Sequence, residues 1–225
     1  MRLSIIIPVL NESQTIVRYL QDLRHRIISE QQIEIIIVDG GSTDNTVALA
    51  APYADYMVCA PKGRASQMNA GAQQASGEYL LFLHADTQLP ENAFSFLQSY
   101  SHPQWGFYRV ALSGKAWFFR VIERMINWRS CMTQVATGDQ CLFVRHSLFL
   151  SVRGFSNIPL MEDVDISKRL RRQFSAYIVN TPVVTSSRKW EQGGIVKTIT
   201  LMWYLRGLYF FGVSPHYLVK KYYSS

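Results

Sequence analysis

Short, continuous runs of apolar residues alternate with helix-like stretches through the first half of this chain, and this alternation limits the possible folds most strongly. The apolar runs have the length of buried strands and cover residues 3–7, 33–38, 56–59 and 79–83. The stretches between them have helical spacing or composition and cover residues 12–29, 43–51 and 64–75. This order predicts an α/β fold, with a mostly parallel sheet and helices on both of its faces.

The second half of the chain is less regular. We expect helices at residues 115–132 and 162–172, and strands at 140–144, 176–179 and 183–185, with Pro182 between the last two. Residues 194–213 are apolar and aromatic, which predicts a helix near the C-terminus. The sequence thus divides into a main domain over residues 1–193 and a helical tail over residues 194–225.

Composition restricts the classes of partner. Hydrophobic residues make up 48% of the 225 residues and charged residues 17%, which predicts a folded core. The net charge of +7 favours an anionic partner: a phosphorylated ligand, an anionic membrane surface or a nucleic acid. The basic residues are scattered and carry no nucleic-acid recognition motif, so we expect no nucleic-acid binding. Three cysteines without paired spacing argue against disulfides and structural zinc and favour a cytoplasmic location. The first apolar run ends at Pro8 and is too short for a signal peptide.

Polar clusters follow three of the predicted strands. They occupy residues 11–12, 39–42 and 84–86. Ligands of open α/β sheets bind beyond the carboxyl ends of the strands. These clusters are therefore the first candidates for a binding site.

The cluster after the second run, residues 39–44, leads from a strand into a helix. Its small residues let a ligand approach the backbone, and the helix start offers N–H groups to an anion. Asp39 at the strand tip could accept hydrogen bonds from a base or a ribose. The alternative is a tight turn in which Asp44 or Ser42 caps the helix.

Two further clusters supply carboxylates. Asp86 could hold Mg²⁺ or Mn²⁺ together with a diphosphate, or it could cap a helix near Pro90 or stabilise a turn with Thr87. Residues 162–165 contain three carboxylates, whose repulsion can raise a pKa and favour proton transfer. The alternative for them is an ordinary acidic helix start.

Other candidates are weaker taken singly. Residues 137–140 form a second Gly-Asp turn before a strand. Four side chains could contact phosphate or could simply be surface groups: Arg64, Asn69, Arg188 and Lys189.

In their order along the chain, these motifs resemble inverting glycosyltransferases of family 2, which have the Rossmann-like GT-A fold. The resemblance covers residues 3 to 175 and rests on five segments: 5–12, 38–46, 63–71, 83–86 and 162–165. Within the family, residues 83–87, 137–140 and 188–191 resemble a small subgroup of short bacterial members.

The resemblance implies a nucleotide-sugar donor, most commonly a UDP sugar, and a divalent cation, Mn²⁺ or Mg²⁺. Asp163 matches the base that deprotonates the acceptor, Glu162 its neighbour, and Asp86 the last acid of the metal motif. Contacts to the substrates are implied for residues matching the other motifs: Pro8, Asn11, Glu12, Asp39, Gly41, Arg64, Asn69, His84, Ala85, Gly138, Asp139, Arg188 and Trp190.

The sequence departs from the family pattern at two positions. Gly40 stands where the nucleoside-binding turn often has a second Asp, and His84 replaces the first Asp of the metal motif. These departures affect the groups that read the base and hold the ribose or metal.

The tail suggests a membrane contact. Arg206 and Gly207 interrupt its apolar stretch, which is then too short to span a bilayer. Its aromatic residues and the basic pair Lys220-Lys221 suit a helix at the inner face of the cytoplasmic membrane, where a lipid-linked acceptor would be found. Packing against the main domain and a homo-oligomer contact are the alternatives.

Two rival functions remain. A nucleotidyltransferase usually has a Gly-rich basic signature near the first strand, where this chain has Pro-Val-Leu-Asn-Glu at residues 8–12. A non-catalytic nucleotide-sugar-binding protein is motivated by Gly40 and His84. The donor sugar, the nucleotide and the acceptor stay open.

Overall fold

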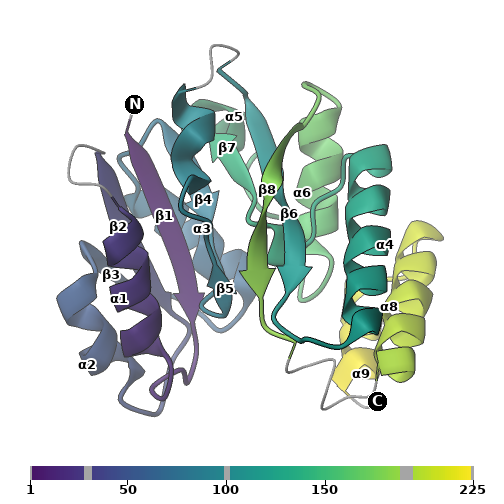
Figure 1. Cartoon of the computed structure of the whole chain (residues 1–225), viewed down its shortest axis with the longest axis horizontal. Helices are drawn as coiled ribbons and strands as arrows, with labels where there is room; N and C mark the ends of the chain where they lie inside the picture. Colours follow the sequence, from purple (N-terminus) through teal and green to yellow (C-terminus); the bar gives the residue numbers. More distant parts are fainter. Residues whose placement is uncertain (1, 28–31, 99–101, 188–194, 224–225) are drawn as a thin grey trace.

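An eight-stranded sheet runs through the molecule in the order β3-β2-β1-β4-β7-β6-β8-β5 (Figure 1). The computed structural model describes residues 2–27, 32–98, 102–187 and 195–223, without the side chains of residues 98, 195–199 and 223. The strands are β1 (Leu3–Val9), β2 (Ile33–Asp39), β3 (Tyr56–Cys59), β4 (Tyr79–Phe82), β5 (Thr87–Gln88), β6 (Trp105–Leu112), β7 (Phe143–Arg145) and β8 (Tyr177–Thr185).

The four strands predicted from the apolar runs form the parallel half of the sheet. β1 pairs with β2 on one side and with β4 on the other, and β3 continues the sheet beyond β2. Side chains alternate between the two faces, so Ile5 and Ile7 enter one core and Ile6 enters the other. Because both faces are covered, the strand sequences are apolar at nearly every position.

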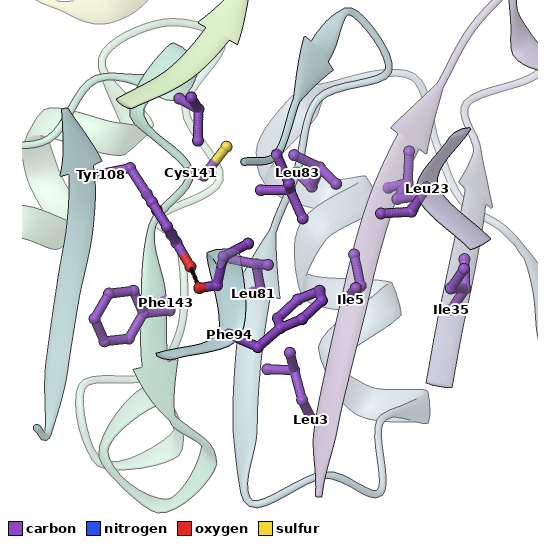
Figure 2. Packing of buried hydrophobic residues seen from close by; sticks show 14 of the residues in the cluster. Leu3, Ile5, Leu23, Ile35, Leu81, Leu83, Phe94, Tyr108, Cys141 and Phe143 are labelled. Atoms are coloured by element: carbon purple, nitrogen blue, oxygen red, sulfur yellow. Dashed lines mark hydrogen bonds between the residues drawn. The ribbon is translucent and has the colours of Figure 1, made fainter. Parts of the chain in front are cut away.

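Helices cover both faces of this half, as predicted. α1 (Ile16–Arg26) packs on the first core, which Figure 2 shows extending from Leu23 past Ile5 to Tyr108. On the opposite face α3 (Arg64–Gln74) covers the parallel strands, and α5 (His146–Ser151) and α6 (Glu162–Arg171) pack on the same core farther along the sheet. The short α2 (Thr46–Ala50) contacts α1. The predicted α/β class is therefore confirmed.

The other half of the sheet is mixed. β7 runs antiparallel between β4 and β6, β6 pairs in parallel with β8, and β5 pairs antiparallel with β8. The prediction of two short strands around Pro182 was wrong, because β8 is continuous. The register of β8 on β6 shifts between Tyr108 and Val110, and Pro182 lies in this bulge, where its missing N–H leaves no ladder bond unmade.

β6 was not predicted from the sequence, since its Gly106 and Arg109 interrupt the apolar pattern. The glycine has a packing reason. A Cβ at Gly106 would lie 2.0 Å from the carbonyl oxygen of Tyr177 on β8. A side chain at this position would push β6 and β8 apart.

The C-terminal helices pack against the main domain. α4 (Trp117–Thr133), α8 (Ile195–Phe210) and α9 (Pro215–Tyr223) lie together at one end of the molecule (Figure 1). Leu205 of α8 and Leu218 of α9 are fully buried against Met161 and Val164 at the start of α6. The predicted helix at 194–213 is confirmed as α8, α9 was not predicted, and the boundary at residue 193 stays a prediction. Among the described helices, none is both long and apolar enough to cross a membrane.

Candidate active site

Four carboxylates from three parts of the chain act electrostatically on the guanidinium group of Arg64 at the start of α3. Asp86 follows β4, Asp139 lies in the 137–140 turn, and Glu162 and Asp163 begin α6. Desolvation alone would lower the pKa of Arg64, but the attraction of these four groups is larger and raises it. Asp86 and Asp163 are therefore on the same side of the molecule.

The two acidic residues of α6 form a desolvated pair. Glu162 is buried, and burial together with the charge of Asp163 raises its pKa, while Arg64 opposes the shift. The pKa of Asp163 is also raised by burial, against the effect of two backbone N–H donors. Gly138 N donates to Asp163 at 2.8 Å and Val164 N at 2.7 Å. The pair is thus oriented by the backbone and is able to take up a proton.

Gly138 joins this pair to His84. A Cβ at Gly138 would lie 3.0 Å from Nε2 of His84 and 3.5 Å from Nη1 of Arg64. Burial, and secondly the charge of Arg64, lower the pKa of His84 to about 3. The imidazole is therefore neutral near pH 7, and it offers a hydrogen bond without a charge where the family has an acid.

Asp86 is exposed at the mouth of the site. Its Oδ1 accepts a hydrogen bond of 3.2 Å from the Thr87 hydroxyl, so the turn expected with Thr87 is present. No group of three His, Cys, Asp or Glu ligands occurs within the described ranges. An exposed carboxylate near Arg64 fits Mg²⁺ or Mn²⁺, which often take one or two protein carboxylates and complete their shell with substrate phosphates and water.

The turn after β2 is held by its own side chains. The Asp39 carboxylate, 5% exposed, accepts hydrogen bonds from Gly41 N and Ser42 N. Thr43 N donates to Asn11, and Thr46 N donates to Asp44. Side-chain oxygens thus occupy the N–H groups of Gly41, Ser42, Thr43 and Thr46, and the anion site at this helix start stays a prediction. Gly41 has φ of 91°, which explains the glycine there.

The loop after β1 is tied to the same turn. Asn11 N donates to the Ser42 hydroxyl at 2.9 Å, and Glu12 N donates to the Thr46 hydroxyl at 2.7 Å. Asn11 and Glu12, predicted to contact substrate, thus also join the ends of β1 and β2. Pro8 belongs to β1 itself.

Gln67 was not predicted, although it links these strand ends to α3. It is buried, and its Nε2 donates to the carbonyl oxygens of Val9 at 2.9 Å and Val38 at 2.8 Å. A Cβ at Gly40 would lie 2.9 Å from the Gln67 amide, which explains the departure from the family pattern at that position. The Gln lies one turn after Arg64, so α3 connects the Asp39 turn to the carboxylate cluster.

The remaining predicted residues differ in their positions and contacts. Both amide atoms of Asn69 bond to the backbone of Phe155, at 2.8 and 2.9 Å, so Asn69 joins α3 to the segment before α6. Ala85 is half-buried between His84 and Asp86. Arg188, Lys189 and Trp190 lie outside the described residues.

Two cavities adjoin the cluster. One of about 20 Å³ is lined by His84, Gly138, Glu162 and Asp163, among others. The other, of about 400 Å³, lies between α4 and α8 and reaches Thr137 and Asp139. Arg129 and Arg206 line this larger groove and were not predicted, although Arg206 interrupts the apolar tail visibly in the sequence.

Known sequences similar to this chain include glycosyltransferases. Residues 4–100 match the family described as Glycosyl transferase family 2. The chain is 30% identical over 148 residues to undecaprenyl-phosphate 4-deoxy-4-formamido-L-arabinose transferase of Proteus mirabilis, covering 61% of this chain and 44% of that protein. It is 35% identical over 95 residues to a PGL/p-HBAD biosynthesis glycosyltransferase of Mycobacterium tuberculosis, covering 39% of this chain and 36% of that protein. The chain thus spans less than half the length of these relatives.

Solved structures share the fold at low sequence identity. TarS 1–349 of S. aureus in complex with UDP-GlcNAc superposes with a TM-score of 0.69 at 16% identity, covering 83% of this chain and 58% of that one. Glucosyl-3-phosphoglycerate synthase of Mycobacterium tuberculosis, with Mn²⁺, UDP and phosphoglyceric acid, gives 0.59 at 17% identity, covering 88% and 75%. Residues 4–100 of this chain are thus similar to glycosyltransferase family 2, and the described part of the chain has the GT-A fold of these solved structures.

Proposed function

We propose that this protein transfers a sugar from a nucleoside diphosphate sugar to an acceptor hydroxyl, with inversion at the anomeric carbon. The observation that carries the proposal is the convergence of Asp86, Asp139, Glu162 and Asp163 around Arg64 beyond the parallel strands. Two fold relatives were crystallised with UDP-GlcNAc or with UDP and Mn²⁺, which supports a UDP sugar as the donor.

In the proposed reaction, the acceptor oxygen attacks the anomeric carbon as the bond from that carbon to the diphosphate oxygen breaks. The electron pair of this bond leaves with the diphosphate, and the acceptor proton passes to Asp163. Two backbone N–H groups hold the Asp163 carboxylate in place, and its raised pKa makes it a stronger base than an exposed aspartate. Glu162, also with a raised pKa, tunes this base or orients the acceptor.

The leaving diphosphate develops negative charge, and Arg64 is a cation placed to stabilise it. Asp86 would hold Mn²⁺ or Mg²⁺, which supplies further charge neutralisation when bound. His84 is neutral and can donate or accept a hydrogen bond at the ribose or the phosphates. Asp39 would contact the nucleoside through carboxylate lone pairs that do not accept hydrogen bonds within its own turn.

Binding of the donor is tested by thermal unfolding with UDP, GDP and their sugars, with and without Mn²⁺. We expect UDP to raise Tm and Mn²⁺ to increase the shift, since a ligand at 100 times its Kd stabilises by about 2.7 kcal/mol. Asp86→Asn should remove the Mn²⁺-dependent part, whereas Asp22→Asn on α1 should keep it. No response to any nucleotide in the wild-type protein would refute the proposed donor.

A further inference from the structure

The groove between α4 and α8 combines an apolar wall with two arginines. The apolar side chains are Ile122, Met125 and Ile126 of α4 and Met202 and Trp203 of α8. Its volume of about 400 Å³ is in the range of small-molecule binding sites. Such a groove holds an elongated apolar group more readily than a free sugar.

The arginines that line this groove have unmet hydrogen-bonding capacity. The Nε atoms of Arg129 and Arg206 are both buried, and neither has a hydrogen-bond partner among the described residues. One guanidinium nitrogen of Arg129, Nη2, donates to the Ser130 hydroxyl at 2.7 Å. Buried polar atoms in folded proteins are nearly always paired, and arginine pairs best with phosphate or carboxylate. An oxyanion in this groove would supply the missing acceptors.

The groove leads to the candidate active site. Thr137 and Asp139 line it, and Gly138 between them donates its N–H to Asp163. Arg129 is also close enough to Asp163 for its charge to act on that carboxylate. A molecule held by Arg129 therefore lies beside the proposed base and not at a remote surface.

We propose that this groove is the acceptor site and that the acceptor is an anionic amphiphile. Its apolar chain lies between α4 and α8, and its phosphate or carboxylate lies at Arg129 and Arg206. The role of the bound molecule as acceptor rests on the proposed glycosyl transfer, but its binding can be measured without a donor.

The test is calorimetric titration of the full chain with decyl phosphate below its micelle concentration. We expect one saturable site, with inorganic phosphate and decanol each binding at least 10-fold more weakly, because each lacks one half of the recognised structure. Decanoate distinguishes a carboxylate head from a phosphate head. Arg206→Met should lower the affinity for decyl phosphate about 10-fold or more, which corresponds to the loss of a charge-assisted hydrogen bond.

Matched variants separate the site from general effects. Arg124→Met removes an exposed arginine of α4 that does not line the groove, and it should leave decyl phosphate binding unchanged. Met125→Gln, at a partly exposed position of the apolar wall, gives a second groove variant if Arg206→Met does not fold, and it should weaken binding several-fold. Trp128→Gln, exposed on the same helix outside the groove, is its control.

Equal affinity of the wild-type protein and both groove variants for decyl phosphate would overturn the proposal. Equal affinity for decyl phosphate and decanol, or for decyl phosphate and inorganic phosphate, would do so as well. If UDP and Mn²⁺ raise Tm but decyl phosphate does not bind, the amphiphile site fails alone. If decyl phosphate binds as expected but no nucleotide does, the groove stands and the proposed glycosyl transfer fails.

Discussion

His84 shows how the surroundings of one residue decide its chemistry. An imidazole in place of an acid would add a second positive charge beside Arg64 if it were protonated. Burial and Arg64 keep it neutral by lowering its pKa to about 3. The replacement of an acid by His84 is therefore compatible with binding an anionic donor.

This shift predicts a pH-dependent stability. The folded pKa of His84 is below the unfolded value of about 6.5, so its contribution is complete above pH 6.5 and is lost as the pH falls toward 3. Between pH 7 and pH 5 we expect the free energy of unfolding of the wild-type protein to fall by about 1–2 kcal/mol more than that of His84→Gln. Urea unfolding at both pH values measures this difference.

The control for this measurement is His25→Gln, at an exposed position of α1. It should show the same loss as the wild-type protein. Identical pH dependence in His84→Gln and the wild-type protein would contradict a neutral, half-buried imidazole.

At the scale of elements, the tail packs on the start of α6 through a small apolar cluster, separate from the two cores of the sheet. Leu205 has no exposed surface and packs among Met161, Val164 and Leu218. Since Val164 follows Asp163 directly, α8 supports the first turn of α6 and thereby the proposed base.

Truncation of this contact should therefore be costly. Leu205→Ala is expected to lower the free energy of unfolding by about 2–5 kcal/mol, the cost of a cavity in a core. Phe210→Ala on the same helix removes a larger side chain that is 77% exposed, and it should change stability by less than about 0.5 kcal/mol. Denaturant unfolding of both variants measures this, and similar small effects would mean that α8 does not support α6.

The elements differ in how well the sequence predicted them. β1, β2 and β4 were predictable because burial on both faces demands continuous apolar runs, and β3 matched its expected residues 56–59. β6 was missed because two residues break the apolar pattern: Gly106, where β8 approaches closely, and Arg109, which is exposed. β8 was divided wrongly because a bulge that tolerates Pro182 depends on the partner strand.

The site was predictable to a similar degree. The carboxylates at positions 86, 162 and 163 and Arg64 could be selected because each matches a family motif. Gln67 could not, since nothing in the sequence of α3 shows which glutamine faces the ends of β1 and β2. Arg129 and Arg206 gain their meaning only when α8 packs beside α4, a contact between segments far apart in the sequence.

At the scale of the whole molecule, one end is apolar on its surface. α4 exposes five apolar side chains, spaced every three or four residues: Trp117, Val121, Met125, Trp128 and Met132. The neighbouring α8 and the residue after it expose Trp203, Phe210 and Phe211, and α9 carries Lys220 and Lys221. The membrane contact predicted from the sequence would lie at this end, where an apolar surface adjoins basic side chains.

Flotation with liposomes that contain anionic lipid tests this contact. The double variant Trp117→Ser/Trp128→Ser should reduce the bound fraction several-fold, because interfacial binding scales with the apolar area buried. Leu150→Ser on α5, 61% exposed and away from this end, should bind like the wild-type protein. Equal flotation of all three proteins would exclude a contact through α4.

The central claim is that Asp163 is the base of a site that Asp86 and Arg64 share. Its most direct test is the turnover of Asp163→Asn with the UDP sugar that raises Tm most. We expect a loss of roughly 100-fold or more, as for a general base, with the Tm shift by the donor retained. Asp165→Asn makes the same change two residues along α6, where the carboxylate pairs with Arg169, and should retain turnover when folded. Wild-type turnover in Asp163→Asn would contradict the account.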